Sequence, residues 1–420
     1  MTCYSVYSKI NPLFRVFLQK TATCRQTFTY SSILSRITAK SAFCGQLTAL
    51  KRCFTTVNLN LSHLAEAETT RKIIGYWLLS CSGMVYGAVV LGGVTRLTES
   101  GLSMVNWNLI KGMKPPQTQQ EWNDEFKRYQ DFPEYKYLNQ DMSLAEFKKI
   151  FYMEYAHRMW GRAIGAVFFL PALFFAYKGW ISKSLKPRLL IYGSLLGFQG
   201  LLGWYMVQSG LDEKKISETQ IPRVSQYRLA AHLGSAFTLY ALMFWQALTH
   251  LLPTQELANT KNLRRLRIYT HGTLSIVFLT ALSGAFVAGL DAGLVYNSFP
   301  KFSGRWIPDD LLAMSPMMKN FFENATTVQF DHRIMGMLTL SAVVGLWAMA
   351  RPLHLHPRAR LAVNTTLAMA GLQILLGIST LLYYVPVHLA ALHQSGSLAL
   401  LTFTLWFGHE IKKCKVVPKI

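Results

Sequence analysis

The sequence predicts an all-α integral membrane protein with eight transmembrane helices, arranged as two pseudo-symmetric four-helix bundles. Three observations support this fold class: long uncharged apolar stretches, basic residues concentrated in alternate loops, and the same motifs in both halves of the chain. Six stretches without Asp, Glu, Lys or Arg reach the roughly 20 residues needed to cross a bilayer. They are residues 73–94, 189–207, 229–252, 268–290, 361–385 and 387–408.

Two further helices are expected at residues 154–177 and 331–350. Each begins with a charged His-Arg pair and continues as an apolar segment, so the charge stands only where the helix enters the membrane. Together with the six uncharged stretches they complete the count of eight.

The first 65 residues differ in composition from the rest of the chain. They hold eight basic residues, many Ser and Thr, and no acidic residue before Glu66. This composition resembles a mitochondrial transit peptide or a disordered basic tail. We therefore expect a transit peptide at 1–65, a first bundle at 66–260 and a second bundle at 261–420.

The net charge of +22 does not indicate a nucleic-acid partner, because part of it lies in that leader and much of the rest in loops between spans. The loops that follow the second, fourth, sixth and eighth helices are basic, whereas the long loops at 95–153 and 291–330 are mixed in charge. Basic loops stay on the side from which a membrane protein inserts. The sequence thus predicts an inner mitochondrial membrane protein with the basic loops and the C-terminus in the matrix.

The two halves repeat the same motifs in the same order. A His-Arg-x-x-Gly unit stands at 157–161 and again at 332–336, and a Gln-x-Leu-Leu-Gly unit at 199–203 and again at 373–377. The helices that follow carry His232 and His393. The first helix of each half starts from the matrix, which makes this a parallel repeat about an axis along the membrane normal.

Four histidines, His157 and His232 in one half and His332 and His393 in the other, lie at similar heights near the intermembrane-space ends of their helices. Two imidazoles at one height suit a heme held from both faces, so each half is expected to bind one. Copper, zinc or a proton relay stay open as alternatives, because imidazole alone does not choose the metal. Nearby glycines are expected to let a flat macrocycle approach: Gly161, Gly234, Gly336 and Gly396.

Arg158 and Arg333, next to a predicted ligand, are expected to pair either with heme propionates or in structural salt bridges. The halves differ three residues before the ligand, where Glu154 in one corresponds to Gln329 in the other. A carboxylate can move protons, whereas an amide can only form hydrogen bonds. This favours chemistry in the first half and an electron-transfer or structural heme in the second. The alternative is that Glu154 only stabilises a helix N-terminus.

At these motifs the chain resembles the heme A synthase family, in its mitochondrial form, over about residues 70–410. The likeness lies in GGVTRLTESGLS at 92–103, EYAHR at 154–158, QGLLGW at 199–204 and DHR at 331–333. The resemblance implies oxidation of the C8 methyl group of heme O to a formyl group, giving the heme A of cytochrome c oxidase.

The resemblance also implies a role for each site residue and for the partners. The first-half ligands, His157 and His232, would hold the substrate heme with Glu154 near the reacting methyl, and His332 and His393 would hold heme b. Electrons would come from a ferredoxin-type donor, and heme O synthase and cytochrome oxidase assembly factors are further partners. A homo-oligomer stays open.

One departure from the family concerns the loop at 95–153, which contains no Cys, whereas some bacterial relatives carry a cysteine pair there. No thiol role can be transferred to this loop. Two other functions compete with the synthase: a diheme b-type electron carrier without substrate chemistry, and a transporter, since parallel repeats are common in transporters.

Overall fold

The computed structural model describes the backbone of residues 35–108, 113–212, 222–255, 257–258 and 260–413, and side chains from residue 66 onward. The chain divides into two compact units, Met1–Glu68 and Thr69–Ile420. Residues 1–34 of the expected transit peptide lie outside the described part, and residues 35–65 are described only as helical backbone. The candidate sites described below all lie in the second unit.

Eight long helices dominate the described residues, and no strand occurs among them. The all-helical prediction is therefore confirmed for this part of the chain. The helices are α3 (Ser35–Leu97), α6 (Leu144–Tyr177), α7 (Lys186–Gly210), α9 (Gln226–Leu251), α10 (Lys261–Gly289), α12 (Ala325–Ala350), α13 (Pro357–Leu382) and α14 (Val387–Glu410).

Six of the described helices are long and apolar enough to cross a membrane: α3 from Glu66 onward, α6, α7, α10, α12 and α13. The other two long helices, α9 and α14, are less hydropathic because they carry His, Gln, Ser and Thr among their apolar residues. Both are central: α9 packs against α7, α10 and α14, and α14 packs against α9, α10 and α13. A helix covered by protein needs less apolar surface than one that faces lipid.

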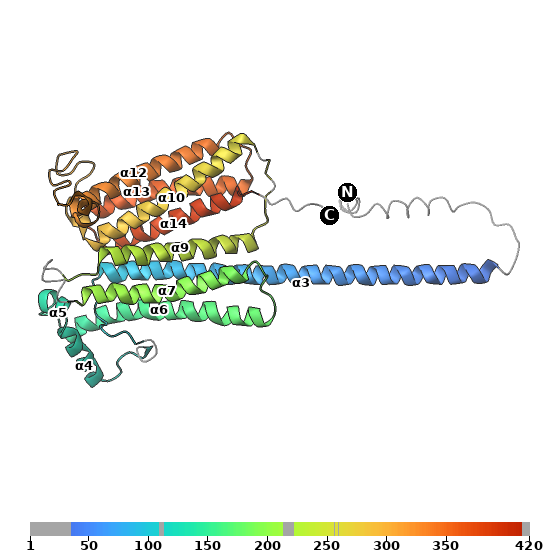
Figure 1. Cartoon of the computed structure of the whole chain (residues 1–420), viewed down its shortest axis with the longest axis horizontal. Helices are drawn as coiled ribbons and strands as arrows, with labels where there is room; N and C mark the ends of the chain where they lie inside the picture. The colour runs from blue at the N-terminus through green and yellow to red at the C-terminus, as the bar shows by residue number, and fades with distance from the viewer. Residues whose placement is uncertain (1–34, 109–112, 213–221, 256, 259, 414–420) are drawn as a thin grey trace. The chain divides into compact units, whose positions relative to one another are not determined.

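The helices of each half lie side by side in Figure 1. In the second half, α10 contacts α12 and α14, and α13 contacts α12 and α14, which closes a four-helix ring. In the first half, α7 contacts α6 and α9. Two indoles join α3 to α6: Trp77 Nε1 donates to the Val167 carbonyl and Trp160 Nε1 to the Met84 carbonyl, each at 2.8 Å.

The halves share one hydrophobic core, which includes Phe168 and Phe237 from the first half and Val343 and Leu398 from the second. Hydrogen bonds between α3 and α14 add to it. The Tyr86 hydroxyl donates to the Ser395 carbonyl at 2.7 Å. The Gln394 amide donates to the Val89 carbonyl at 3.0 Å.

The long loops that precede α6 and α12 have structure of their own. The first contains α4 (Gln119–Gln130) and α5 (Pro133–Leu138), and α4 packs against α6. The second contains the short helices η2 (Ala292–Leu294), η3 (Met317–Lys319) and α11 (Asn320–Glu323).

Both loops begin with an acidic residue in the left-handed region, Glu99 at φ 52° and Asp291 at φ 53°. An acidic residue in this conformation is uncommon. Its recurrence after the first helix of each half supports the internal repeat.

Candidate heme sites

Each predicted ligand packs against a glycine of the preceding helix. A Cβ added to Gly92 of α3 would lie 3.1 Å from Nε2 of His157 on α6. A Cβ on Gly284 of α10 would lie 3.2 Å from Cε1 of His332 on α12. At these distances a methyl group in place of the glycine hydrogen would require the histidine ring to shift. These glycines were missed in the sequence because only the fold brings them beside the histidines.

The same arrangement holds for the second ligand of each half. A Cβ on Gly203 of α7 would lie 3.5 Å from Cε1 of His232 on α9, and one on Gly377 of α13 would lie 2.8 Å from Cε1 of His393 on α14. These are the last glycines of the two Gln-x-Leu-Leu-Gly motifs. The repeat seen in the sequence therefore has a packing cause.

The glutamines that open these motifs hold the same histidines. Gln373 Nε2 donates to the His393 carbonyl at 2.7 Å and lies 3.1 Å from Nδ1 of that ring. With its amide turned, Gln199 places its nitrogen 3.1 Å from Nδ1 of His232. Each motif thus supplies both a polar contact that orients the ring and a glycine that makes room for it.

The second histidine pair is spaced so that one metal ion would fit between the two rings. The ring centroids of His332 and His393 lie 6.2 Å apart, with the rings at 86°. A metal–imidazole nitrogen bond of about 2 Å to each ring would need the two ring centroids to lie about 6 Å apart. The described geometry fits that requirement.

The tautomer of His332 also fits metal binding. The Ser283 hydroxyl donates to the Thr280 carbonyl at 2.7 Å and lies 2.7 Å from Nδ1 of His332. With its proton already donated, Ser283 accepts from Nδ1–H, which leaves the lone pair of Nε2 for a metal.

The first pair is packed like the second, His157 against Gly92 and His232 against Gly203. A Cβ on Gly161 would meet nothing within 4 Å, so the role predicted for this glycine stays a prediction. The other predicted glycines pack on side chains: Gly234 on Leu282, Gly336 on Ile374 and Gly396 on Gln373.

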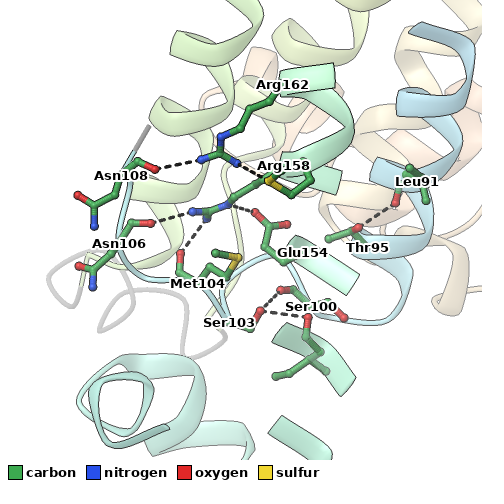
Figure 2. Close-up of polar contacts among 12 residues, drawn as sticks. Leu91, Thr95, Ser100, Ser103, Met104, Asn106, Asn108, Glu154, Arg158 and Arg162 are labelled. Atoms are coloured by element: carbon green, nitrogen blue, oxygen red, sulfur yellow. Dashed lines mark hydrogen bonds and ion pairs between the residues drawn. The ribbon is translucent and has the colours of Figure 1, made fainter. Parts of the chain in front are cut away.

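Arg158 is the centre of the polar contacts around Glu154 (Figure 2). Its Nε lies 2.6 Å from Glu154 Oε1, and both side chains are buried. Its Nη1 donates to the Asn106 carbonyl and its Nη2 to the Met104 carbonyl, both at 2.8 Å. The guanidinium carbon also lies 4.5 Å from the ring centroid of Trp107. All three nitrogens of Arg158 therefore have protein partners.

Arg333 of the second half is bound differently. Its Nη2 donates to Gln329 Oε1 at 2.9 Å and to the Tyr296 carbonyl at 2.8 Å. Its Nε and Nη1 are buried and have no hydrogen-bond partner among the described residues. Gln329 Nε2 in turn donates to the Ala292 carbonyl at 2.6 Å and the Tyr296 carbonyl at 3.2 Å. A glutamate at that position could make neither of these two contacts.

Glu134 is a buried carboxyl in α5 that was not predicted from the sequence. Only 5% of its surface is exposed, and it accepts a hydrogen bond from the Tyr129 hydroxyl at 3.0 Å. Burial raises the pKa of Glu134 to about 8, and the nearby Glu99 and Glu154 also favour its neutral form. Nothing in a loop rich in charged residues marks this one as buried.

The profile of the COX15-CtaA family, described as cytochrome oxidase assembly protein, matches residues 75–405. This chain belongs to that family. The match includes six of the long helices in full, parts of α3 and α14, and all four predicted ligand histidines.

Several relatives are named heme A synthase. The human heme A synthase COX15 is 60% identical over 353 residues, which cover 84% of this chain and 85% of that protein. The Saccharomyces cerevisiae heme A synthase COX15 is 43% identical over 370 residues, 82% of this chain and 76% of that protein. The heme A synthase of Nitrosospira multiformis is 47% identical over 343 residues, 82% of this chain and 94% of that protein.

These relatives confirm the predicted resemblance to heme A synthases of the mitochondrial type and, with it, the oxidoreductase class. Together with six helices suited to crossing a membrane, they support a multi-pass protein of the inner mitochondrial membrane. The roles of individual site residues stay predictions.

Proposed function

We propose that this chain is a heme A synthase that oxidises the C8 methyl group of heme O to a formyl group, giving heme A for cytochrome c oxidase. One observation carries the proposal: a chain related over 84% of its length to a protein named heme A synthase brings its repeat-matched His332 and His393 to a ring separation of 6.2 Å. Heme O is the proposed substrate, and the lipid bilayer is the proposed environment.

The proposed architecture has eight membrane-spanning helices in two bundles, residues 66–260 and 261–420, after a transit peptide at 1–65. The histidine sites face the intermembrane space and the C-terminus lies in the matrix. The central placement of α9 and α14 supports counting them as spans despite their lower hydropathy. Basic matrix loops suit an acidic, ferredoxin-type electron donor, since complementary charge speeds encounter.

His332 and His393 are proposed to hold heme b, and His157 and His232 to hold the substrate heme. Heme b, when bound, supplies one-electron transfer. The Nε2 lone pair of His332 and the 6.2 Å separation of the second pair support this assignment. The buried Nε and Nη1 of Arg333 suit a propionate. For Arg158, the contacts favour the alternative role of a structural salt bridge, because its three nitrogens are already engaged.

Glu154 is proposed to hold and accept protons beside the reacting methyl group. Its pairing with Arg158 fixes one carboxylate oxygen, and its position three residues before His157 on the same helix supports this role. In the second half the Gln329 amide donates to two loop carbonyls, which supports a non-catalytic role for Gln329.

The test is extraction and mass analysis of the hemes bound to the purified protein, with absorption spectra of His157→Ala and His332→Ala. We expect heme b together with heme O, its hydroxylated form or heme A, and we expect each variant to lose its own heme. Heme b in both sites even when heme O is supplied would instead establish a diheme electron carrier.

A further inference from the structure

The segment at residues 102–108 crosses the outer ends of α6 and α7, and we call it the strap. At one end, Leu102 packs so closely on α7 that a Cβ on Gly210 would lie 2.7 Å from its Cδ2 atom. The Ser103 hydroxyl lies 3.2 Å from the Ile150 carbonyl of α6. The strap therefore covers the outer ends of two helices that border the first histidine pair.

Trp107 is the half-buried side chain of the strap that reaches the first site. A Cβ on Gly203 would lie 3.6 Å from Cη2 of Trp107 and 3.5 Å from Cε1 of His232. The indole and the ligand ring therefore meet at the same glycine. On its other side, the indole contacts the guanidinium of Arg158, the residue after His157. Trp107 thus stands between the elements that carry the two ligands.

Two arginines of α6 hold the strap, and they hold it through backbone carbonyls (Figure 2). Arg158 donates to the carbonyls of Met104 and Asn106, and Arg162 donates to the Asn108 carbonyl at 3.0 Å. The side chains at 106 and 108 are exposed, so their contribution is mainly this backbone contact. At residues 106 and 108 the strap is therefore held to α6 through its backbone, whereas its first four side chains, at 102–105, are buried.

The second half holds its loop through different residues. Arg333 donates to the Tyr296 carbonyl, and Gln329 adds two donations from its amide, to Ala292 and Tyr296. Glu154, which corresponds to Gln329, has no N–H group and donates to neither loop nor strap. Of these two corresponding positions, only Gln329 donates to its loop.

We propose that the strap is the releasable cover of the first site and that Trp107 controls the admission of the substrate heme and the release of the product. This inference rests on the proposed function of the first pair. Trp107 is a positioning residue here: it takes no part in the oxidation and acts by closing the site on the bound heme. The second site, with its amide-fastened loop, keeps its heme throughout.

The test uses the full-length purified protein loaded with heme O and heme b, and follows heme transfer to excess apomyoglobin by absorption. Trp107→Ala is expected to raise the rate of heme loss from the first site about tenfold, since affinity is tuned mainly through dissociation. It should leave loss from the second site unchanged and raise KM for heme O more than it lowers kcat. Trp107→Phe, which keeps an aromatic ring over Arg158, should restore most of the retention.

Trp306→Ala is the matched control, because Trp306 is an exposed tryptophan in the corresponding loop of the second half. This variant should change neither the rate of heme loss from the first site nor that from the second. Unchanged loss from the first site in Trp107→Ala, or equal acceleration at both sites, would overturn the strap proposal. A wild-type protein that takes up no heme O at the first site would instead overturn the proposed function.

Discussion

At the scale of single residues, the two halves differ most at one pair of positions. Glu154 and Gln329 are both buried, and both contact the arginine four residues later on the same helix face. The common contact with arginine keeps the geometry of the halves alike. The two side chains differ in what they can do besides contacting arginine. The glutamate can accept a proton, whereas the glutamine donates its amide hydrogens to loop carbonyls.

Glu154→Gln is predicted to keep both hemes but to lose conversion. The amide preserves the contact of Oε1 with Arg158 and removes only the ability to take a proton, so the rate of heme A formation should fall at least about 100-fold. Heme A formation in isolated membranes, with heme content as the reference, measures this. Glu146→Gln, at the exposed start of the same helix, is the control. A normal rate in Glu154→Gln would remove Glu154 from the mechanism.

At the scale of elements, helix boundaries follow capping more closely than hydropathy. The second helix was expected from residue 154, yet α6 begins at Leu144, because Ser143 and Glu146 form a capping box there. Conversely, α13 ends at Leu382, before the expected residue 385, because Tyr384 and Val385 adopt positive φ. Hydropathy indicates where a helix meets lipid, whereas its hydrogen-bonded start and end are set by local backbone chemistry.

The packing of α10 on α12 gives a prediction at this scale. Gly284→Ala would place a methyl group 3.2 Å from His332 Cε1, so the ring must shift at a cost of about 1–3 kcal/mol. We expect at least about tenfold weaker retention of heme b, measured by heme titration. Gly272→Ala is the matched control on the same helix, because a Cβ there meets nothing within 4 Å. Equal heme binding in both variants would show that the close contact does not position His332.

The α4–α5 region gives a prediction of pH dependence. Because the folded pKa of Glu134 is raised to about 8 from 4.5, the folded state binds this proton more tightly than the unfolded state. The contribution of Glu134 to stability is therefore fully present below about pH 4.5 and is lost as the pH rises toward 8. Between these two pH values the free energy of unfolding should fall by on the order of 1 kcal/mol per pH unit in the wild type. Glu134→Gln should remove this fall.

The measurement is thermal unfolding of the α4–α5 region, followed through its tryptophan Trp122 between pH 5 and pH 8.5. The stability of Glu134→Gln relative to the wild type should increase as the pH rises across this range. Asp141→Asn, which replaces an exposed carboxylate in the same loop, is the control and should leave the slope unchanged. A constant difference between Glu134→Gln and the wild type at all pH values would contradict the assignment.

At the scale of the whole molecule, features that are local in the sequence could be predicted, whereas contacts between distant segments could not. The all-helical fold and the family follow from patterns along the chain, since apolar length and motif spacing are local properties, whereas the ligand roles of the four histidines stay predictions. The packing of Gly92 and Gly284 on the ligand histidines could not be predicted in this way, because it depends on a neighbouring helix. The burial of Glu134 and the strap held by Arg158 are likewise tertiary, joining residues far apart in sequence.

The repeat itself yields the last prediction, which concerns how the halves divide their work. If Gln329 fastens the second loop, Gln329→Glu should weaken it, because two amide donations are lost and a carboxylate then faces two carbonyl oxygens. Two lost hydrogen bonds at about 1 kcal/mol each correspond to roughly tenfold or faster loss of heme b. Transfer to apomyoglobin measures this, and the unchanged first site of the same protein is the internal control. Slow heme b loss in Gln329→Glu would mean that Arg333 alone closes the second site, and that Glu154 differs from Gln329 for its chemistry only.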